Sequence, residues 1–193
     1  MSDLTIRPAR SSDAADLAIL ENIASHGLAC WLWQGAVNRG KAEDAYEWGR
    51  SRFLNTEDDV SFEQALVAED HAGVQGCIVS YMMPELDADN LIPDIANLMA
   101  LFANSSGDWF IDSLAVYPSH RGMGLGRTLM EASQAQAQRE GADHISLVVE
   151  DSNENALSLY HKLGFVEIGR RPCDKLPGNT KTENWLRLRA AVK

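Results

Sequence analysis

The sequence has few of the features that mark secreted, metal-binding or membrane proteins. It holds only three cysteines in 193 residues, and no two of them are close enough to form a metal-binding pair. The first residues contain neither a basic leader nor an apolar run long enough for a signal peptide or a membrane span. We therefore expect a cytoplasmic chain with no membrane segment and no metal site.

Basic charge is also scarce, because the formal net charge is −11 at pH 7. This balance argues against a general nucleic-acid-binding protein, which needs a basic surface against phosphates. Residues 1–105 carry 17 acidic and 6 basic side chains, whereas residues 106–193 carry 11 of each. The acidic first half forms either a solvated surface or the wall of a site for a cationic ligand.

The hydropathy pattern predicts strands and helices of a mixed α/β domain. Strands are expected over residues 4–9, 62–70, 73–83, 108–118, 144–150, 164–172 and 183–191. Helices are expected to begin at a cap formed by Ser12 or Asp13, near residue 41, near residue 93, after the glycines at 122–126, and at a cap formed by Asn153 or Asp151. Residues 27–40 are not assigned to an element, and their Trp31 and Trp33 are either core anchors or the lining of a pocket.

A glycine-rich stretch, SHRGMGLGRTLM at residues 119–130, follows the strand expected at 108–118. Glycine weakens a helix by up to about 1 kcal/mol per residue, so glycines at a helix start need a reason. They let the backbone approach a phosphate closely, and a helix N-terminus presents N–H groups to such an anion. Arg121 and Arg127 flank the loop and can add charge-assisted hydrogen bonds. The alternative is that the glycines only allow tight helix–strand packing.

The spacing of these glycines excludes two common nucleotide motifs. The dinucleotide pattern G-x-G-x-x-G fails, because Arg127 follows Gly122 and Gly124 where a third glycine is needed. The ATP-binding loop fails because no lysine precedes Thr128. The pattern that does fit is R-x-x-G-x-G, at residues 121–126.

This hexapeptide resembles the acetyl-coenzyme A pyrophosphate loop of the GNAT superfamily of N-acetyltransferases. The preceding IDSLAVYPSH is similar to the family's fourth strand, which ends in V-x-P, and the downstream NENALSLYHKLGF is similar to its second signature, N-x-x-A-x-x-x-Y-x-K-x-G-F. The resemblance implies a GNAT-like α/β (α+β) fold. Its sheet is mixed, mostly antiparallel, made of about seven strands, flanked by helices and splayed between strands 4 and 5.

The same resemblance implies a single acetyltransferase domain over residues 1–193. Residues 1–83 would form the acceptor side, 84–105 an insertion, 106–171 the acetyl-CoA-binding core, and 172–193 the C-terminal loop and strand. The insertion combines an acidic loop with an amphipathic helix. It shapes either the acceptor pocket or a homodimer interface.

Cofactor contacts follow from the resemblance residue by residue. Backbone groups of Leu114 and Val116 are expected to bind the pantetheine arm between the splayed strands. Asn153 and Lys162 are expected to reach the cofactor from the later helix, although Asn153 is otherwise only a helix cap. The pyrophosphate is expected at the loop residues Arg121, Gly122, Met123, Gly124, Gly126 and Arg127.

Two side chains match the family's catalytic positions. A lysine-like amine, with a pKa near 10.4, must lose a proton before it attacks a thioester. Asp112 is the expected base, directly or through water; alternatively, it only binds a cationic acceptor or caps neighbouring backbone. Tyr160 is expected to protonate the leaving thiolate; alternatively, it is a half-buried aromatic residue whose hydroxyl is bonded elsewhere.

The sequence thus predicts an acetyl-CoA-dependent N-acetyltransferase that transfers acetyl directly to an amine without a metal. The acidic first half favours a cationic small molecule as the acceptor. Two other interpretations stay open. One is a non-catalytic acyl-CoA sensor or interaction module, and the other is an acyltransferase that uses another acyl-CoA or a hydroxyl acceptor.

Overall fold

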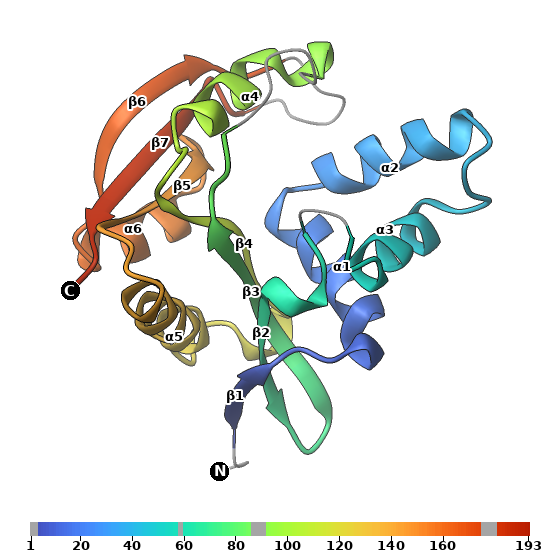
Figure 1. Ribbon diagram of the computed structural model, residues 1–193, viewed down its shortest axis with the longest axis horizontal. Coiled ribbons are helices and arrows are strands. Elements are labelled where there is room, and N and C mark those ends of the chain that lie inside the picture. Colours follow the sequence, from blue (N-terminus) through green and yellow to red (C-terminus); the bar gives the residue numbers. More distant parts are fainter. Residues whose placement is uncertain (1–3, 58–59, 86–91, 175–180) are drawn as a thin grey trace. The chain divides into compact units, whose positions relative to one another are not determined.

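A computed structural model describes residues 4–57, 60–85, 92–174 and 181–193 of the chain (Figure 1). The strands are β1 (Thr5–Pro8), β2 (Ala65–Asp70), β3 (Gly73–Met82), β4 (Trp109–Val116), β5 (His144–Glu150), β6 (Val166–Pro172) and β7 (Asn184–Ala191). The α-helices are α1 (Ala14–Ala24), α2 (Leu28–Asn38), α3 (Ala45–Leu54), α4 (Ala96–Ala103), α5 (Leu125–Arg139) and α6 (Glu154–Lys162).

The strands form one seven-stranded mixed sheet in the order β1-β2-β3-β4-β5-β7-β6. β4 and β5 run parallel, whereas β1–β2, β2–β3, β5–β7 and β6–β7 pair antiparallel. β3 and β4 are also antiparallel, because Tyr117 N donates to Gln75 O and Met83 N donates to Asp108 O, each at 2.9 Å. The predicted fold class is confirmed.

The parallel pairing between β4 and β5 is short. It joins Trp109–Ile111 to Ile145–Leu147, although β4 continues to Val116 and β5 to Glu150. β5 remains paired with β7 over its whole length. In the described part of the chain, β4 and β5 therefore leave their common ladder after Ile111, which confirms the predicted splay.

The chain divides into two compact units. The first unit comprises Met1–Ser80 and Ser113–Ser133, and contains β1, β2 and the helices α1, α2 and α3. The second unit comprises Tyr81–Asp112 and Gln134–Lys193, and contains β5, β6, β7, α4 and α6. β3, β4 and α5 each pass from one unit into the other. The predicted site residues are consequently distributed over both units.

Helix α2 occupies the tryptophan-rich segment that the sequence pattern leaves unassigned. The turn from α1 takes left-handed backbone at His26 (φ 50°) and Gly27 (φ 98°). The N-cap of α2 is Gly27 rather than Ser, Thr, Asp or Asn, so the usual signal for a helix start is missing. Of the two roles considered for the tryptophans, core anchor or pocket lining, Trp33 has the first, because it is 2% exposed and belongs to the core. Trp31 is half-buried.

The Trp33 ring fixes the spacing between α2 and α3 in the first unit. It meets the Tyr46 ring edge-on, with the ring centroids 6.1 Å apart. It also lies against Gly49 of α3, where an added Cβ would be 2.7 Å from the ring atoms Cη2 and Cζ3. Only a residue without a side chain allows this approach.

One of the two predicted caps of the first helix is confirmed in position, because Asp13 is the N-cap residue of α1, but its side chain makes no cap hydrogen bond to that helix. A 3-10 turn over Ser11–Asp13 precedes α1, and the Asp13 carboxylate closes that turn by accepting from Arg10 N at 2.8 Å. The same carboxylate accepts from Arg7 Nη1 at 2.6 Å. Burial acts to raise the pKa of Asp13, but the hydrogen bonds from Arg7 and Arg10 hold that pKa below its usual range.

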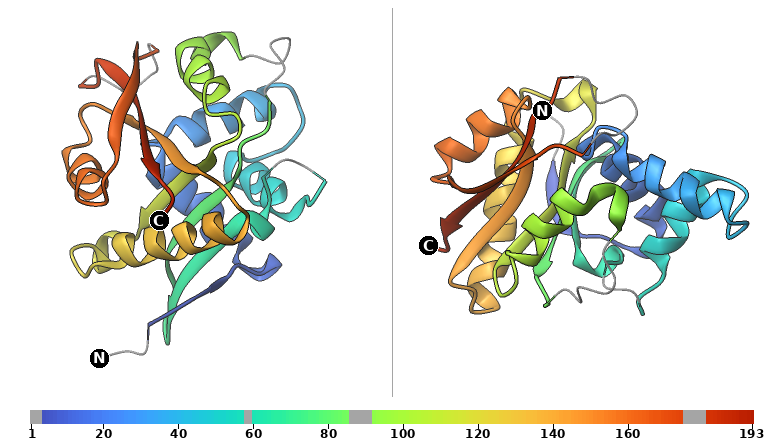
Figure 2. Two further views of the ribbon diagram at one scale, coloured as in Figure 1. Left: turned by 60° about the vertical axis from the view of Figure 1, so that its left-hand side comes forward. Right: turned by 90° about the horizontal axis from the view of Figure 1, so that it is seen from above.

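The helix predicted near residues 93–103 is present as a short 3-10 turn followed by α4. α4 lies across β5, β6 and β7 in the second unit (Figure 2). The Asp174 carboxylate holds its first turn by accepting from Asn97 N and Leu98 N, each at 3.1 Å, and its Oδ2 also accepts from Trp185 Nε1 at 3.1 Å. Negative charge at a helix N-terminus is stabilising. Residues 86–91 of the predicted insertion lie outside the described residues.

A buried carboxylate fastens the start of β4 within the second unit. Asp108, which is 3% exposed, accepts from Arg187 Nη2 at 2.9 Å and from Arg189 Nη2 at 2.8 Å. Both arginines belong to β7, and Arg187 Nε also donates to Ser105 Oγ at 2.9 Å. These bonds hold β4 in register at the end where it still pairs with β5.

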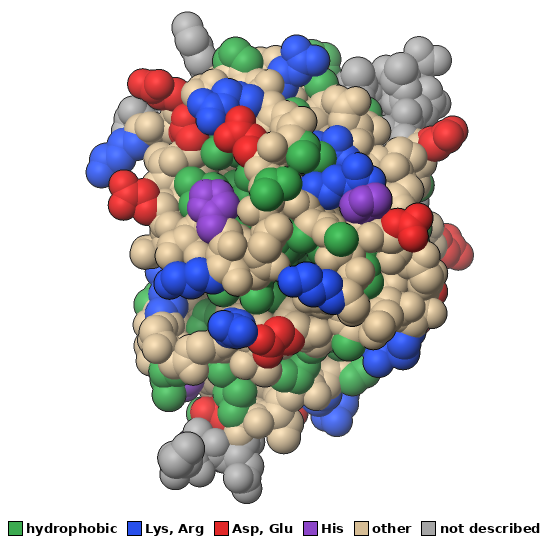
Figure 3. All heavy atoms as spheres, turned by 90° about the vertical axis from the view of Figure 1, so that its left-hand side faces the viewer, with side chains coloured by type: hydrophobic (Ala, Val, Ile, Leu, Met, Phe, Trp, Pro, Cys, Tyr) green, Lys and Arg blue, Asp and Glu red, His purple; other side chains and the backbone are tan. Residues whose placement is uncertain are grey.

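Charges of both signs share the surface. On the face shown in Figure 3, Lys and Arg side chains lie interspersed with Asp and Glu. Within the ranges that the structure describes, no helix combines the length and the apolar character needed to cross a membrane.

The Trp33–Gly49 contact predicts that Gly49→Ala destabilises the protein. Overpacking costs about 1–3 kcal/mol, and the helix propensity gained over glycine offsets only about 1 kcal/mol of that cost. Thermal unfolding should show a melting temperature lower by a few degrees. Gly35→Ala in α2 is the matched control, because its Cβ would meet only the mobile guanidinium end of Arg39, at 3.2 Å. The control should be neutral or slightly stabilised, and equal stability of both variants would contradict the prediction.

Candidate functional site

The glycine loop lies in the first unit, between β4 and α5. Gly122 and Gly124 have left-handed backbone, with φ of 76° and 85°. Such conformations are costly for residues with a side chain. A Cβ at either position would meet no atom within 4 Å, so tight packing does not explain these two glycines. The backbone shape explains them, and the space beside them is open to a ligand.

Helix α5 begins directly at this loop. Its first residue is Leu125, and Thr128 N donates to Gly124 O at 3.1 Å as the helix starts. The first N–H groups of an α-helix have no acceptor within the helix, and they carry partial positive charge. Gly126 lies in this first turn. The loop and the helix start together have the properties of an anion site.

The two arginines that flank the loop are exposed and bonded within the first unit. Arg121 Nε donates to the Val116 carbonyl oxygen at 3.0 Å, at the end of β4. Arg127 Nε donates to Glu131 Oε1 at 2.8 Å, one turn along α5. Met123 is also exposed, with 69% of its surface accessible. An anion at this loop would have to draw the arginines from these contacts.

Leu114 and Val116 are half-buried and alternate with the buried Ser113 and Ala115 along β4. On the β3 side, Gly76 comes so close that an added Cβ would lie 2.7 Å from the Ala115 carbonyl oxygen. This strand therefore packs tightly against β3 where it has left the ladder with β5.

Helix α6 carries three predicted residues in the second unit. Asn153 is its N-cap, and Asn153 Oδ1 accepts from Ala156 N at 3.3 Å. Lys162, which is exposed, is its last residue. The cap role of Asn153 is thus confirmed, while its contact with a cofactor stays a prediction.

Tyr160 lies on the same helix and is 7% exposed. Its ring packs against Phe165, with centroids 5.7 Å apart. Burial raises the pKa of the Tyr160 hydroxyl to about 12. The hydroxyl therefore keeps its proton at neutral pH and can serve as a proton donor.

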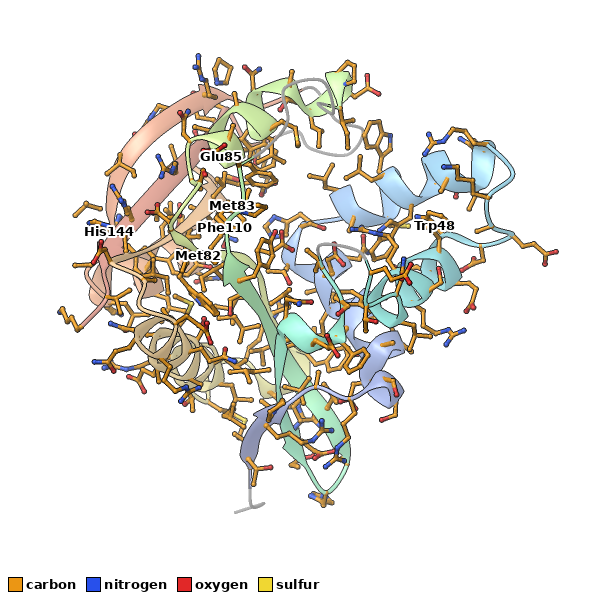
Figure 4. The ribbon with its side chains drawn as sticks, viewed as in Figure 1. Trp48, Met82, Met83, Glu85, Phe110 and His144 are labelled. Atoms are coloured by element: carbon orange, nitrogen blue, oxygen red, sulfur yellow. The ribbon has the colours of Figure 1, made fainter. Side chains whose placement is uncertain are left out.

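Asp112 is half-buried on β4, one residue beyond the last pair with β5. The Tyr81 hydroxyl donates to Asp112 Oδ1 at 3.2 Å. Figure 4 shows Phe110 on β4 and Met82 and Met83 at the neighbouring end of β3, the end that carries Tyr81. No local sequence pattern marks Tyr81 as a site residue, because its approach to Asp112 depends on the register between two strands.

The predicted residues thus form two groups. Leu114, Val116 and the loop residues belong to the first unit, whereas Asp112, Asn153, Tyr160 and Lys162 belong to the second. In the described ranges, no three His, Cys, Asp or Glu side chains are placed to hold a metal ion together.

Comparison with known proteins identifies a family. The model of the Acetyltransferase (GNAT) family matches residues 33–165, which include both sequence signatures. Streptothricin acetyltransferase of Streptomyces lavendulae is 39% identical over 59 residues, covering 31% of each chain. An N-alpha-acetyltransferase of Sulfurisphaera tokodaii is 33% identical over 98 residues, covering 50% of this chain and 55% of that protein. The matched stretches thus span between a third and about half of these relatives.

A similar fold occurs in a Salmonella typhimurium protein whose structure contains acetyl-CoA as its cofactor. The TM-score is 0.64 and the sequence identity 20%, with 100% of this chain and 95% of that chain covered. At this identity the similarity concerns the fold alone.

The two roles considered for Asn153 predict different results for two variants. Asn153→Ala removes the cap and should cost about 1 kcal/mol of stability, whereas Asn153→Ser keeps a capping oxygen and should cost little. If Asn153 also contacts acetyl-CoA, both variants should weaken binding about fivefold, the value of one hydrogen bond. Thermal unfolding and calorimetric titration with acetyl-CoA measure the two effects. Wild-type affinity in Asn153→Ser would leave Asn153 with the cap role only.

Proposed function

This chain belongs to the GNAT family of acetyltransferases, and we propose that it transfers an acetyl group directly from acetyl-CoA to an amine. The observation that carries the proposal is the family match over residues 33–165, which spans the glycine loop and the α6 signature. The open, left-handed loop at the start of α5 and the splay of β4 from β5 support it. Acetyl-CoA is the co-substrate typical of this family.

In the proposed reaction, acetyl-CoA supplies a thioester as acyl donor. The loop amides and the positive start of α5 hold its pyrophosphate, with Arg121 and Arg127 as added charge partners. Backbone groups of Leu114 and Val116 bind the pantetheine amides as an added strand would. A backbone N–H at Leu114 or Ala115 faces the oxyanion that forms on the acetyl carbonyl.

Two side chains move the protons. Asp112 accepts a proton from the acceptor ammonium, directly or through water, and so frees the nitrogen lone pair for attack on the thioester. The C–N bond forms and the C–S bond breaks, and the Tyr160 hydroxyl gives its proton to the leaving thiolate. The nitrogen of the new amide releases its second proton, which restores the Tyr160 hydroxyl directly or through water. With a pKa of about 12, that hydroxyl is protonated at neutral pH.

We further propose a cationic small molecule as the acceptor. The support is the charge distribution, since residues 1–105 carry 17 acidic and 6 basic side chains. The second candidate is the α-amine of a peptide. It is supported by the match to an N-alpha-acetyltransferase, which extends over 98 residues, whereas the match to streptothricin acetyltransferase extends over 59. A panel that contains a polyamine, an aminoglycoside, free amino acids and short peptides, assayed by thiol release, separates the two candidates.

Gly124→Glu is expected to abolish acetyl-CoA binding, because it adds bulk and negative charge to the phosphate loop and forces a side chain onto left-handed backbone. Calorimetric titration should show micromolar affinity for the wild type and at least a tenfold loss in the variant. Gly141→Glu is the control, since Gly141 follows the other end of α5, is also left-handed (φ 73°) and is equally open. Absence of binding in a folded wild type would overturn the proposed function.

Tyr160→Phe is expected to lower kcat about 100-fold or more, the contribution of a positioned general acid, while acetyl-CoA affinity stays within about twofold. With a pKa of about 12, Tyr160 keeps its proton up to pH 10. Ionisation of Tyr160 should therefore not lower the wild-type rate at pH 10 or below. Unchanged turnover in Tyr160→Phe would contradict the assigned role. Cofactor binding without turnover of any amine would favour the sensor interpretation.

A further inference from the structure

We propose that Tyr81 is a positioning residue for Asp112, and that its hydroxyl holds this carboxylate in the orientation in which it accepts the proton of the amine. The inference rests on the proposed function. Tyr81 lies outside both sequence signatures, and Tyr81 and Asp112 both belong to the second unit.

The strand register brings the two residues together. Met83 N donates to Asp108 O and Gly107 N donates to Met83 O, each at 2.9 Å, which fixes β3 against the start of β4. Tyr81 lies near this end of β3 and packs against Phe110 of β4, and Asp112 is two residues further along β4, on the same face of that strand as Phe110. Aromatic side chains reach such diagonal neighbours. The Tyr81 hydroxyl accordingly lies 3.2 Å from Asp112 Oδ1.

An aromatic cluster holds the Tyr81 ring in place. Its centroid is 6.2 Å from that of Phe110, at an interplanar angle of 57°. Phe110 is 1% exposed and meets Phe102 of α4 edge-on, with the centroids 5.2 Å apart. Packed rings of this kind restrict side-chain rotation. The direction of the Tyr81 hydroxyl is therefore set by α4 and β4 before any substrate binds.

The contact fixes the direction of the carboxylate. A hydroxyl that donates to a carboxylate favours the charged form, so loss of the donor is measurable as a change in the pKa of that carboxyl. The bond favours one rotamer of Asp112, one residue beyond the last pair between β4 and β5. The geometry thus gives Tyr81 a role in orienting the carboxylate.

A purely structural role would make the Tyr81 hydroxyl matter for stability alone. Tyr81→Phe keeps the ring and removes the hydroxyl, so the aromatic cluster survives. Tyr117→Phe is the matched control, because the Tyr117 hydroxyl donates to another carboxylate, Asp16 Oδ1, at 2.7 Å within the first unit. Both variants lose one hydroxyl–carboxylate bond, and only the first touches Asp112.

The first test is a titration of the aspartate side-chain carboxyls followed by carbon-13 NMR, with the Asp112 signal assigned from Asp112→Asn. Tyr81→Phe should raise the pKa of Asp112, and Tyr117→Phe should leave it unchanged. Placing 3-fluorotyrosine at position 81 strengthens the donor and should lower the pKa of Asp112. An Asp112 signal with the same pKa and chemical shift in the wild type and Tyr81→Phe would overturn the inference.

The second test uses the amine that the acceptor screen identifies. Tyr81→Phe should lower kcat about tenfold with an unchanged KM for acetyl-CoA, because positioning acts on the proton transfer. If the wild type turns over the amine and Tyr81→Phe has the same kcat, the positioning role is refuted and the proposed function still stands. If the wild type acetylates no amine, the proposed function fails, and the NMR titration still decides whether Tyr81 controls Asp112.

Discussion

The ladder between β4 and β5 ends after the Ile111–Leu147 pair, while both strands continue. Backbone N–H and C=O groups that leave a ladder need other partners, because unpaired polar groups are costly when they lose water. On β5 the ladder with β7 continues, but β4 from Asp112 onward keeps only its β3 side. This interruption creates the polar strand edge that a pantetheine arm would need, and it places Asp112 at its beginning.

Two carboxylates fasten the elements around the paired part of β4. Asp108, which is buried, binds Arg187 and Arg189 of β7 just before β4 begins. Asp174 holds the first turn of α4, which lies across β5, β6 and β7. α4 in turn supplies Phe102 to the aromatic cluster that holds the Tyr81 ring.

The anion loop depends on backbone shape more than on charge. Left-handed conformations at Gly122 and Gly124 lie between β4 and the start of α5, and both glycines face open space. Arg121 and Arg127 are exposed and are bonded to Val116 O and Glu131. In the proposed function, the loop backbone already has its shape before acetyl-CoA binds, whereas the two arginines would have to leave their present partners.

Local signals determined much of this protein. The β2–β3 turn at residues 71–73, the α6 cap at Asn153 and the glycine loop could all be predicted, because each depends on residues within a few positions of one another. Helix α2 lacks the Ser, Thr, Asp or Asn cap that marks a helix start. Asp13 does occupy the N-cap position of α1, but its carboxylate binds Arg7 and Arg10 instead of the helix.

The tertiary structure alone decided which side chains of different helices and strands meet. Trp33 requires Gly49 on another helix, and Tyr81 reaches Asp112 over a separation of 31 residues. Such contacts depend on strand register and helix spacing. Both are set by packing over the whole unit, so no local pattern of residues encodes them.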